Sequence, residues 1–187
     1  MADTRSELEA LALARIQRSG VRDLSFRVLA DDIGVKSSSV HYHFPEKGDL
    51  TAALITGYTE RFVARLAQIS AQRGTARSKL MAFVDLFEEA ATSDKLCLCG
   101  MLAAELSALD DRSRTLLELF FKQSEDWLAK LLKTHKSELT SSLTPANLAS
   151  VMMSGLEGAL LLDRAHGAGR HLRAQRQWIA SLVAKAR

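Results

Sequence analysis

The amino-acid sequence predicts an all-α protein, and two observations support this prediction. Only 2 prolines and 10 glycines interrupt the 187 residues, and several of them mark short breaks between long continuous stretches. Within those stretches, apolar residues recur at spacings of three and four, which is the period of an amphipathic helix. The chain has an ordinary globular composition, because 47% of its residues are hydrophobic and 25% are charged. No stretch approaches the ~20 apolar residues that cross a bilayer, so we expect no membrane-spanning segment.

Three short helices are expected at the start of the chain. Their apolar spacing predicts them over residues 5–19, 25–33 and 38–44. Gly20 and Gly34 follow the first two helices, at a position where glycine commonly ends a helix. Pro45 stops the third helix, because the residue before a proline disfavours helical geometry.

Six further helices are expected in the rest of the chain, which brings the total to about nine. We predict them over residues 46–72, 76–92, 100–109, 112–135, 145–166 and 172–185. Thr144 and Pro145 form a strong start signal, since a hydroxyl caps the helix and proline at its first position loses no needed N–H. Asp110 and Asp111 mark another helix start.

Residues 25–50 have the pattern of a helix-turn-helix. Such a motif needs a small residue where its two helices cross, a turn residue that tolerates left-handed geometry, and a few aliphatic side chains. Ala30 is small and Gly34 supplies the turn. The aliphatic side chains are Leu29, Ile33, Val35 and Val40. The second helix carries hydroxyl and ring donors suited to phosphates and base edges of DNA, namely Ser37, Ser38, Ser39, His41, Tyr42 and His43. On spacing alone, a plain helical hairpin is an equal alternative.

The two halves of this segment resemble the signature of the TetR/AcrR family of bacterial transcriptional regulators. The first half reads SFRVLADDIGV over residues 25–35, and the second reads VHYHFPEKGDL over residues 40–50. The similarity lies in an aromatic-rich recognition helix, a following Phe, a short linker with Lys, and a Leu that opens the next helix.

The resemblance implies a homodimer that places each third helix in a major groove of a palindromic operator. It implies a three-helix DNA-binding domain over residues 1–48 and an effector-binding and dimerisation domain over residues 49–187. A small-molecule effector would release the DNA, so the expected function is a ligand-responsive regulator, in the first instance a repressor. Release by thiol modification is an alternative, which rests on Cys97 and Cys99 and not on the resemblance.

The resemblance also assigns roles to single residues. Ser25 and Lys47 are expected at phosphates, and Tyr42 at the DNA backbone. Ser37, Ser39 and His43 are expected to face the groove, and Lys36, Ser38 and His41 complete the expected DNA-binding set. His41 stands where the family usually has Tyr, and Ser38 replaces a frequent Gly, so no base preference carries over.

The charge of the first 48 residues is balanced, with seven Lys or Arg and seven Asp or Glu. Attraction to phosphates must therefore come from a local patch, for which Arg22, Arg27, Lys36 and Lys47 are the candidates.

Cys97 and Cys99 form a Cys-x-Cys pair that allows three interpretations. They can be buried packing residues, an oxidant- or electrophile-sensing pair activated by Lys95, or two ligands of a soft metal. A metal site would need at least one more ligand, so we predict no metal.

An apolar effector pocket and a dimer interface are expected in the second domain. The candidate pocket residues are Phe62, Met81, Phe83, Phe87, Cys97, Cys99, Met101, Phe120, Trp127 and Met152. For each of them, core packing is the alternative. The small residues of segment 150–162 allow close helix approach, either to a second copy or to a helix of the same subunit. The candidate interface residues are Met152, Gly155, Gly158, Ala159, Trp178, Ile179 and Leu182.

Other classes of function are disfavoured by what the sequence lacks. No nucleophile elbow, phosphate loop, zinc-protease motif or Rossmann glycine pattern is present, so we predict neither an enzyme nor a cofactor. Two cysteines cannot build a disulfide framework, and no signal peptide precedes the first helix, so we expect a cytoplasmic protein. A helical protein–protein adaptor is the alternative that needs no DNA.

Overall fold

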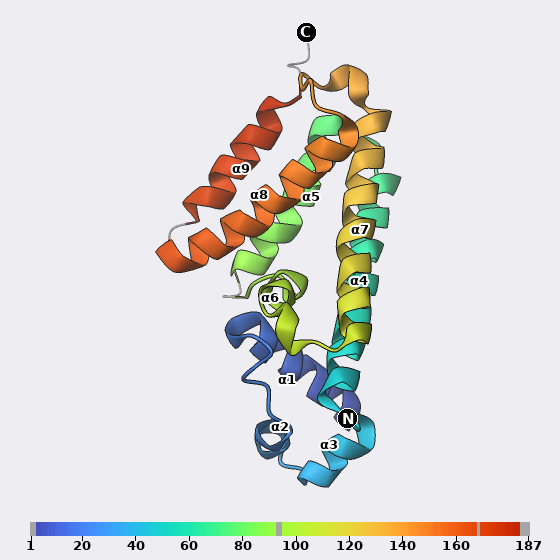
Figure 1. Ribbon diagram of the computed structural model, residues 1–187. Coiled ribbons are helices and arrows are strands. Elements are labelled where there is room, and N and C mark those ends of the chain that lie inside the picture. The colour runs from blue at the N-terminus through green and yellow to red at the C-terminus, as the bar shows by residue number, and fades with distance from the viewer. Residues whose placement is uncertain (1–2, 93–94, 168, 184–187) are drawn as a thin grey trace. The chain divides into compact units, whose positions relative to one another are not determined.

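The computed structural model describes residues 3–92, 95–167 and 169–183, and every regular element in these ranges is helical (Figure 1). The helices in them are α1 (Thr4–Ser19), α2 (Phe26–Ile33), α3 (Ser37–His43), α4 (Lys47–Ala71), α5 (Ala76–Thr92), α6 (Leu98–Ala104), α7 (Asp111–Thr134), α8 (Pro145–His166) and α9 (Arg170–Ser181). Two 3-10 turns, η1 (Leu106–Ala108) and η2 (Lys136–Glu138), follow α6 and α7. A single isolated β-bridge joins Leu139 to Val183 in this part of the chain. The predicted all-α fold is confirmed.

Contacts divide the chain into two units that do not follow its order. The first unit comprises Met1–Glu60 and Leu98–Phe120, and the second comprises Arg61–Cys97 and Phe121–Arg187. Both α4 and α7 begin in the first unit and end in the second. Helix α6 and the start of α7 thus belong with the N-terminal helices.

The N-terminal helices pack around a small apolar core in the first unit. Leu29, Ala30 and Val40 are at most 2% exposed, where α2 crosses α3. Gly34 ends α2 at φ 72° and ψ 31°, in the left-handed region that glycine adopts without strain. The N–H of Val35 then donates to the carbonyl oxygen of Ala30 at 3.0 Å, which closes the turn. The small crossing residue and the glycine turn predicted from the sequence are confirmed.

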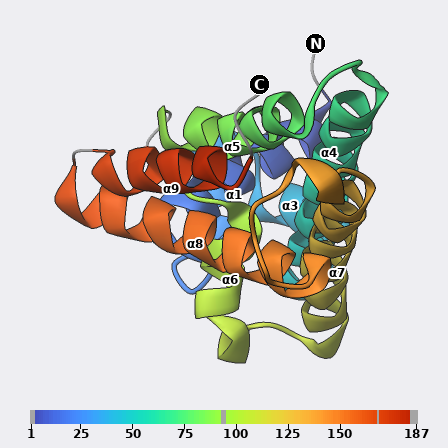
Figure 2. The same ribbon diagram turned by 90° about the horizontal axis from the view of Figure 1, so that it is seen from above.

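Helices α8 and α9 lie side by side in the second unit (Figure 2). The Asp163 carboxylate accepts the backbone N–H groups of His171 and Leu172 at 2.9 Å, and His171 Nδ1 lies 2.8 Å from Oδ1. Burial opposes ionisation of Asp163, but these hydrogen bonds outweigh it and hold its pKa below the ordinary value. The carboxylate therefore satisfies N–H groups at the start of α9 that have no partner within the helix.

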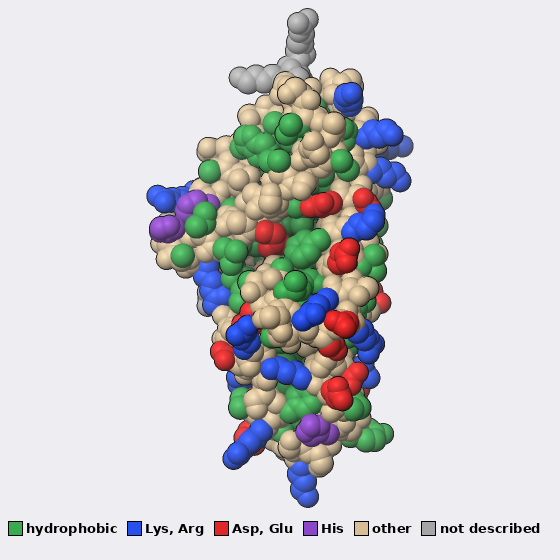
Figure 3. All heavy atoms as spheres, viewed as in Figure 1, with side chains coloured by type: hydrophobic (Ala, Val, Ile, Leu, Met, Phe, Trp, Pro, Cys, Tyr) green, Lys and Arg blue, Asp and Glu red, His purple; other side chains and the backbone are tan. Residues whose placement is uncertain are grey.

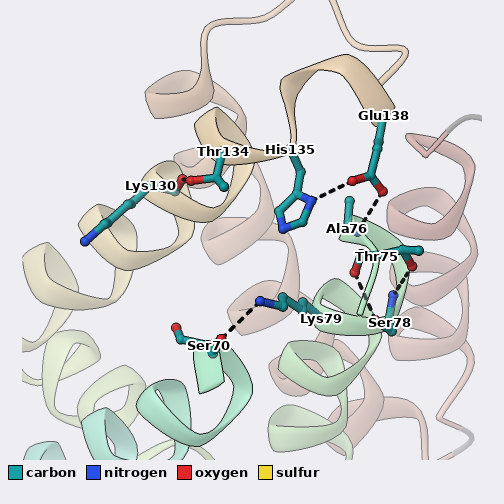
Figure 4. A network of polar contacts seen from close by, with 9 residues as sticks. All are labelled: Ser70, Thr75, Ala76, Ser78, Lys79, Lys130, Thr134, His135 and Glu138. Carbon is teal, nitrogen blue, oxygen red and sulfur yellow. Dashed lines mark hydrogen bonds and ion pairs between the residues drawn. The ribbon is translucent and has the colours of Figure 1, made fainter. Parts of the chain in front are cut away.

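A polar network closes the turn between α4 and α5 against the end of α7 (Figure 4). Glu138 Oε2 accepts the N–H of Ala76 at 2.8 Å, and its Oε1 lies 2.6 Å from Nδ1 of His135. The hydrogen bond to His135, and then that to Ala76, lower the pKa of Glu138. Lys79 Nζ donates to the carbonyl oxygen of Ser70 at 3.1 Å, which fixes the other side of the turn.

Several predicted helix starts are confirmed by their caps. The hydroxyl of Thr144 accepts the N–H of Asn147 at 3.2 Å, with proline at the first position of α8. Asp110 Oδ1 accepts the N–H of Ser113 at 2.7 Å and so caps α7. The N-cap of α3 is Lys36, whose side chain makes no cap hydrogen bond.

Two other boundaries differ from the prediction. Helix α6 begins at Leu98, two residues before the predicted start at residue 100, so Cys99 lies in the helix. It ends at Ala104, and the 3-10 turn η1 follows it. The run predicted as one helix over residues 100–109 is therefore two separate elements. Helix α9 begins at Arg170, directly after Gly169. It ends at Ser181, four residues before the predicted end, and Lys185 itself lies outside the described residues.

Candidate DNA-binding surface and effector region

Helix α3 is held by one face and exposes the other. Val40 is fully buried, and Phe44, directly after the helix, is 1% exposed. Between them the side chain of Tyr42 is 83% exposed. Ser37 and Ser38 are also exposed at the start of the helix. This arrangement presents hydroxyl and phenol groups to the outside of the first unit.

The remaining predicted contact residues around α3 are partly engaged within the chain. His41 is exposed, but its Nδ1 lies 3.2 Å from the carbonyl oxygen of Pro45, and its ring meets the Phe26 ring edge-on at 5.1 Å. His43 is half-buried, with its ring 5.2 Å from that of Tyr42. Ser25 and Ser39 are half-buried. The His41 and His43 rings therefore have contacts within the chain, and Ser25 and Ser39 are less exposed than Tyr42.

The four candidate cations fall into two kinds. Arg27 and Lys36 are exposed, and the side chain of neither has an ion pair or hydrogen bond among the described residues. Lys47 donates from Nζ to the carbonyl oxygen of Arg22 at 3.3 Å, and burial lowers its pKa against the opposing attraction of Glu105 and Asp23. Figure 3 shows Lys and Arg side chains at the end of the first unit that carries α2 and α3. Of the four cations proposed from the sequence, Arg27 and Lys36 thus have free side chains, whereas Arg22 and Lys47 are engaged within the chain.

Cys97 and Cys99 are buried, 5% and 0% exposed. Glu157 on α8 is half-buried, and its Oε1 is sealed from solvent and has no hydrogen-bond partner among the described residues. Burial raises the pKa of Glu157 to about 7, and a hydrogen bond donated by the Cys97 thiol partly opposes this shift. Burial shields both thiols from solvent, so this environment supports packing more than thiol reactivity.

Four of the predicted effector residues come together in the second unit. The Phe83 ring stacks on Trp127 at 5.5 Å and meets Phe87 edge-on at 5.5 Å, while Phe62 lies 6.4 Å from Phe83. Phe83 and Phe87 are buried, whereas Phe62 and Trp127 are half-buried. Met81 is half-buried and Met152 is fully buried in the same unit.

Three of the other predicted effector residues belong to the first unit, whereas Cys97 belongs to the second. Cys99 and Phe120 are buried in the first unit, and Met101 is half-buried. The structure therefore does not place all ten candidates in one unit.

Two hollows lie within the second unit. An open groove of about 700 Å³ runs between α4 and α7 and reaches Trp127. It is lined by Val63, Leu66, Ala67, Ser70, Ala71, Gln123, Asp126 and Trp127. Ser70 Oγ accepts the indole N–H at 2.8 Å, which fixes the Trp127 ring at the wall of the groove. A smaller hollow of about 310 Å³, with Lys95 and Arg164 in its lining, lies beside the end of α8.

The predicted interface residues separate into buried and accessible ones. Met152, Ala159 and Ile179 are at most 3% exposed and pack inside their own subunit. A Cβ on Gly155 would lie 2.8 Å from the amide of Gln175 on α9, so Gly155 serves packing within the chain. Gly158, Trp178 and Leu182 remain half-buried, and nothing lies within 4 Å of a Cβ on Gly158.

The exposed side of α8 carries apolar residues that lie within segment 150–162 but are not among the candidate interface residues named above. Val151, Leu161 and Leu162 are 44%, 47% and 48% exposed. Figure 3 shows apolar side chains gathered over α8 and α9 on the face in view. Together with Gly158 and Trp178, these three residues form what we call the α8 apolar face.

The described residues hold no group of three or more His, Cys, Asp or Glu side chains that could bind a metal ion. Across the same ranges, no helix is both long and apolar enough to cross a membrane.

Comparison with known proteins identifies the family of this chain. Residues 76–177 match the C-terminal domain family of LmrA/YxaF-like transcriptional regulators. A TetR transcriptional regulator from Legionella pneumophila is 31% identical, with a TM-score of 0.91 over 98% of this chain and 99% of that one. The chain belongs to the TetR family of transcriptional regulators.

Two further TetR-type relatives agree with this assignment. A TetR-family regulator from Agrobacterium tumefaciens is 25% identical, with a TM-score of 0.92 over 97% of this chain and 98% of that one. The nicotine-responsive transcriptional repressor HdnoR of Paenarthrobacter nicotinovorans is 24% identical over 85% of this chain and 82% of that protein. As a TetR-family member, the chain is a ligand-responsive, DNA-binding regulator of transcription, and members of this family are not enzymes.

Sequence reasoning missed Glu157 and Glu105 as residues with a special environment. Glu157 carries a detectable signal, because it is a lone acid within the apolar run of residues 151–162. Glu105 carries none, since its partners lie more than eighty residues away along the chain.

The environment of Glu157 predicts a specific pH dependence of stability. The folded pKa of about 7 lies above the ordinary 4.5, so between these values the unfolded chain is ionised while the folded one is still protonated. The free energy of unfolding therefore falls as pH rises through this window. We expect Glu157→Gln to remove that loss, so that the variant gains about 2–3 kcal/mol on wild type between about pH 5 and pH 8.

Urea unfolding at fixed protein concentration measures this difference. Glu118→Gln is the matched control, because Glu118 is exposed on α7. Parallel stability–pH curves for wild type and Glu157→Gln would contradict the assignment.

Proposed function

We propose that this TetR-family protein is a homodimeric repressor that binds a palindromic operator with α3 in the major groove and leaves it when a small molecule binds. The exposure of Tyr42 beside the fully buried Val40 carries this proposal, because a helix held on one side by its own core is free to enter a groove. Residues 1–48 would serve as the DNA-binding domain and residues 49–187 as the effector and dimerisation domain, acting in the cytoplasm of a bacterial cell. The relatives described as repressors support this direction of control.

The contacts at the operator follow from the accessibility of each residue. Tyr42, Ser37 and Ser38 have the freedom to meet base edges or the backbone, and Lys36 the freedom to meet a phosphate. Ser25, Ser39, His41, His43 and Lys47 complete the proposed surface as groups that are half-buried or bonded within the chain. A protein–protein adaptor would explain neither the family membership nor this pattern.

The proposed effector is a small molecule of apolar or mixed polarity that binds in the second unit. The groove that reaches Trp127 offers apolar walls together with Asp126, Gln123 and a serine hydroxyl. The relative from Paenarthrobacter nicotinovorans responds to nicotine, which is a compound of this general kind. Release by thiol modification has less support, because Cys97 and Cys99 are both buried.

The proposed dimer uses the α8 apolar face. Exposed aliphatic side chains beside an unobstructed glycine allow two copies of α8 and α9 to approach closely as a four-helix bundle. Burial of Val151, Leu161 and Leu162 against a second copy removes apolar surface that the isolated chain leaves in water.

Substitutions on α3 test the proposed recognition helix. The probe is a duplex selected from random sequences by the wild-type protein. We expect Tyr42→Ala to weaken binding about tenfold or more, since it removes a backbone contact from both halves of the site. Lys36→Ala should reduce the slope of log affinity against log salt by about 2, one phosphate for each subunit.

Gel-shift titrations at several salt concentrations provide both readouts. Lys130→Ala is the control for loss of an exposed cation, since Lys130 lies on the second-unit part of α7. The proposal fails if wild-type protein enriches no sequence, or if Tyr42→Ala binds as tightly as wild type.

Sedimentation tests the dimer. We expect wild type to sediment as a dimer at micromolar concentration, and Leu161→Arg to raise the dimer dissociation constant at least about tenfold by placing a charge in the interface. Leu119→Arg serves as the control. Leu119 is similarly exposed, at 44%, but it lies on α7 and is not part of the α8 apolar face. A monomeric wild type, or two arginine variants that sediment alike, would refute this interface.

A further inference from the structure

The connection between α6 and α7 reaches the turn between α1 and α2, and both belong to the first unit. The Glu105 carboxylate accepts the backbone N–H of Val21 through Oε2 in a short hydrogen bond, and that of Arg22 at 3.3 Å. Val21 is only 2% exposed, so water cannot readily replace this acceptor. A single side chain thus satisfies two donors of a turn that lies more than eighty residues away in sequence.

Gly20, the residue before Val21, leaves room for the Glu105 carboxylate. Gly20 has φ 87°, in a region that L side chains rarely adopt. A Cβ at this position would lie 2.6–2.8 Å from the carboxylate atoms of Glu105, closer than real Cβ contacts. The turn is therefore built around Glu105, and glycine is required both for its backbone and for space.

The contacts continue from the turn to groups that the proposed function places at DNA. The Arg22 carbonyl oxygen accepts from Lys47 Nζ at 3.3 Å, and the Arg22 guanidinium donates to Ser107 Oγ at 2.8 Å. Lys47 is the first residue of α4. Ser25, the N-cap of α2, follows Arg22 by three residues. Both Ser25 and Lys47 are proposed phosphate contacts.

We infer that Glu105 is a positioning residue for operator binding, which acts through the Val21 and Arg22 backbone to set where Ser25 and Lys47 meet phosphates. The inference rests on the proposed function, since it concerns the same DNA-binding surface. It adds that a residue outside segment 1–48 determines the geometry of that surface. Affinity for DNA is then sensitive to the placement of the α6–α7 connection.

The sign of the effect separates positioning from simple electrostatics. A carboxylate repels phosphates, so removal of its charge alone would strengthen binding. Removal of its hydrogen bonds releases the turn and weakens binding to a specific site. Glutamine retains an acceptor oxygen of nearly the same reach without the charge, and aspartate retains the charge with a shorter reach.

The experiment compares the Glu105 variants on the duplex selected by wild-type protein and on an unrelated duplex. We expect Glu105→Ala to lose about tenfold in affinity for the selected duplex, Glu105→Asp about threefold, and Glu105→Gln less than about twofold. Affinity of Glu105→Ala for the unrelated duplex should be unchanged or higher, because non-specific binding depends on charge and not on placement. Glu118→Ala, which removes an exposed acid from α7, should bind the selected duplex at least as tightly as wild type.

Amide hydrogen exchange on the same proteins reports the turn directly. Exchange at Val21 and Arg22 should accelerate in Glu105→Ala, while exchange at Val40 and Phe44 stays slow. If Glu105→Ala does not fold, the comparison of Glu105→Asp with Glu105→Gln carries the test.

Several results would overturn the inference. Equal binding of the selected duplex by Glu105→Ala and Glu118→Ala would do so, as would glutamine proving as harmful as alanine. Equal losses on both duplexes would assign Glu105 to general folding. If wild type selects no duplex at all, it is the proposed function that fails, and the exchange rates at Val21 and Arg22 still test the turn.

Discussion

Burial of one side of α3 is the constraint on which the rest of the structure depends. A seven-residue helix has too few hydrogen bonds to be stable in isolation, so its conformation is fixed by packing. Val40 and Phe44 supply that packing from within a small core that Leu29 and Ala30 complete. Because these anchors hold only one face, Tyr42, Ser37 and Ser38 stay in solvent, and the helix keeps a surface that can bind DNA.

The elements on either side of α2 and α3 must also be held in position. Residues that lie far from them in sequence do this. Glu105 holds the turn before α2, while Asp110 lies against Gly48 at the start of α4, where no Cβ would fit. Arg112 forms an ion pair with Asp49 at 3.4 Å nearby, although its exposure makes this contact weak. Within the first unit, the segment that follows α6 thus contacts both the turn before α2 and the start of α4. The contact-defined unit is therefore larger than residues 1–48.

Local rules explain which features could be predicted from the sequence. Gly34, Pro45 and the Thr144-Pro145 pair act through their own backbone geometry, so their effects appear where the sequence places them. The interface residues could not be sorted in this way, because Met152 and Leu161 are equally apolar and only packing shows that one is buried and the other exposed. The contact of Glu105 with Val21 depends on the folded chain alone and leaves no mark in the sequence.

Chemical protection of operator DNA tests the central claim most directly. Guanine N7 lies in the major groove, so a recognition helix there shields it from dimethyl sulfate, whereas adenine N3 in the minor groove stays reactive. The account predicts that bound wild-type protein protects guanine N7 in two patches about one helical turn, or a small multiple of it, apart on one face of the duplex. Protection of adenine N3 without guanine N7, or a single protected patch, would contradict a symmetric pair of α3 helices in the major groove.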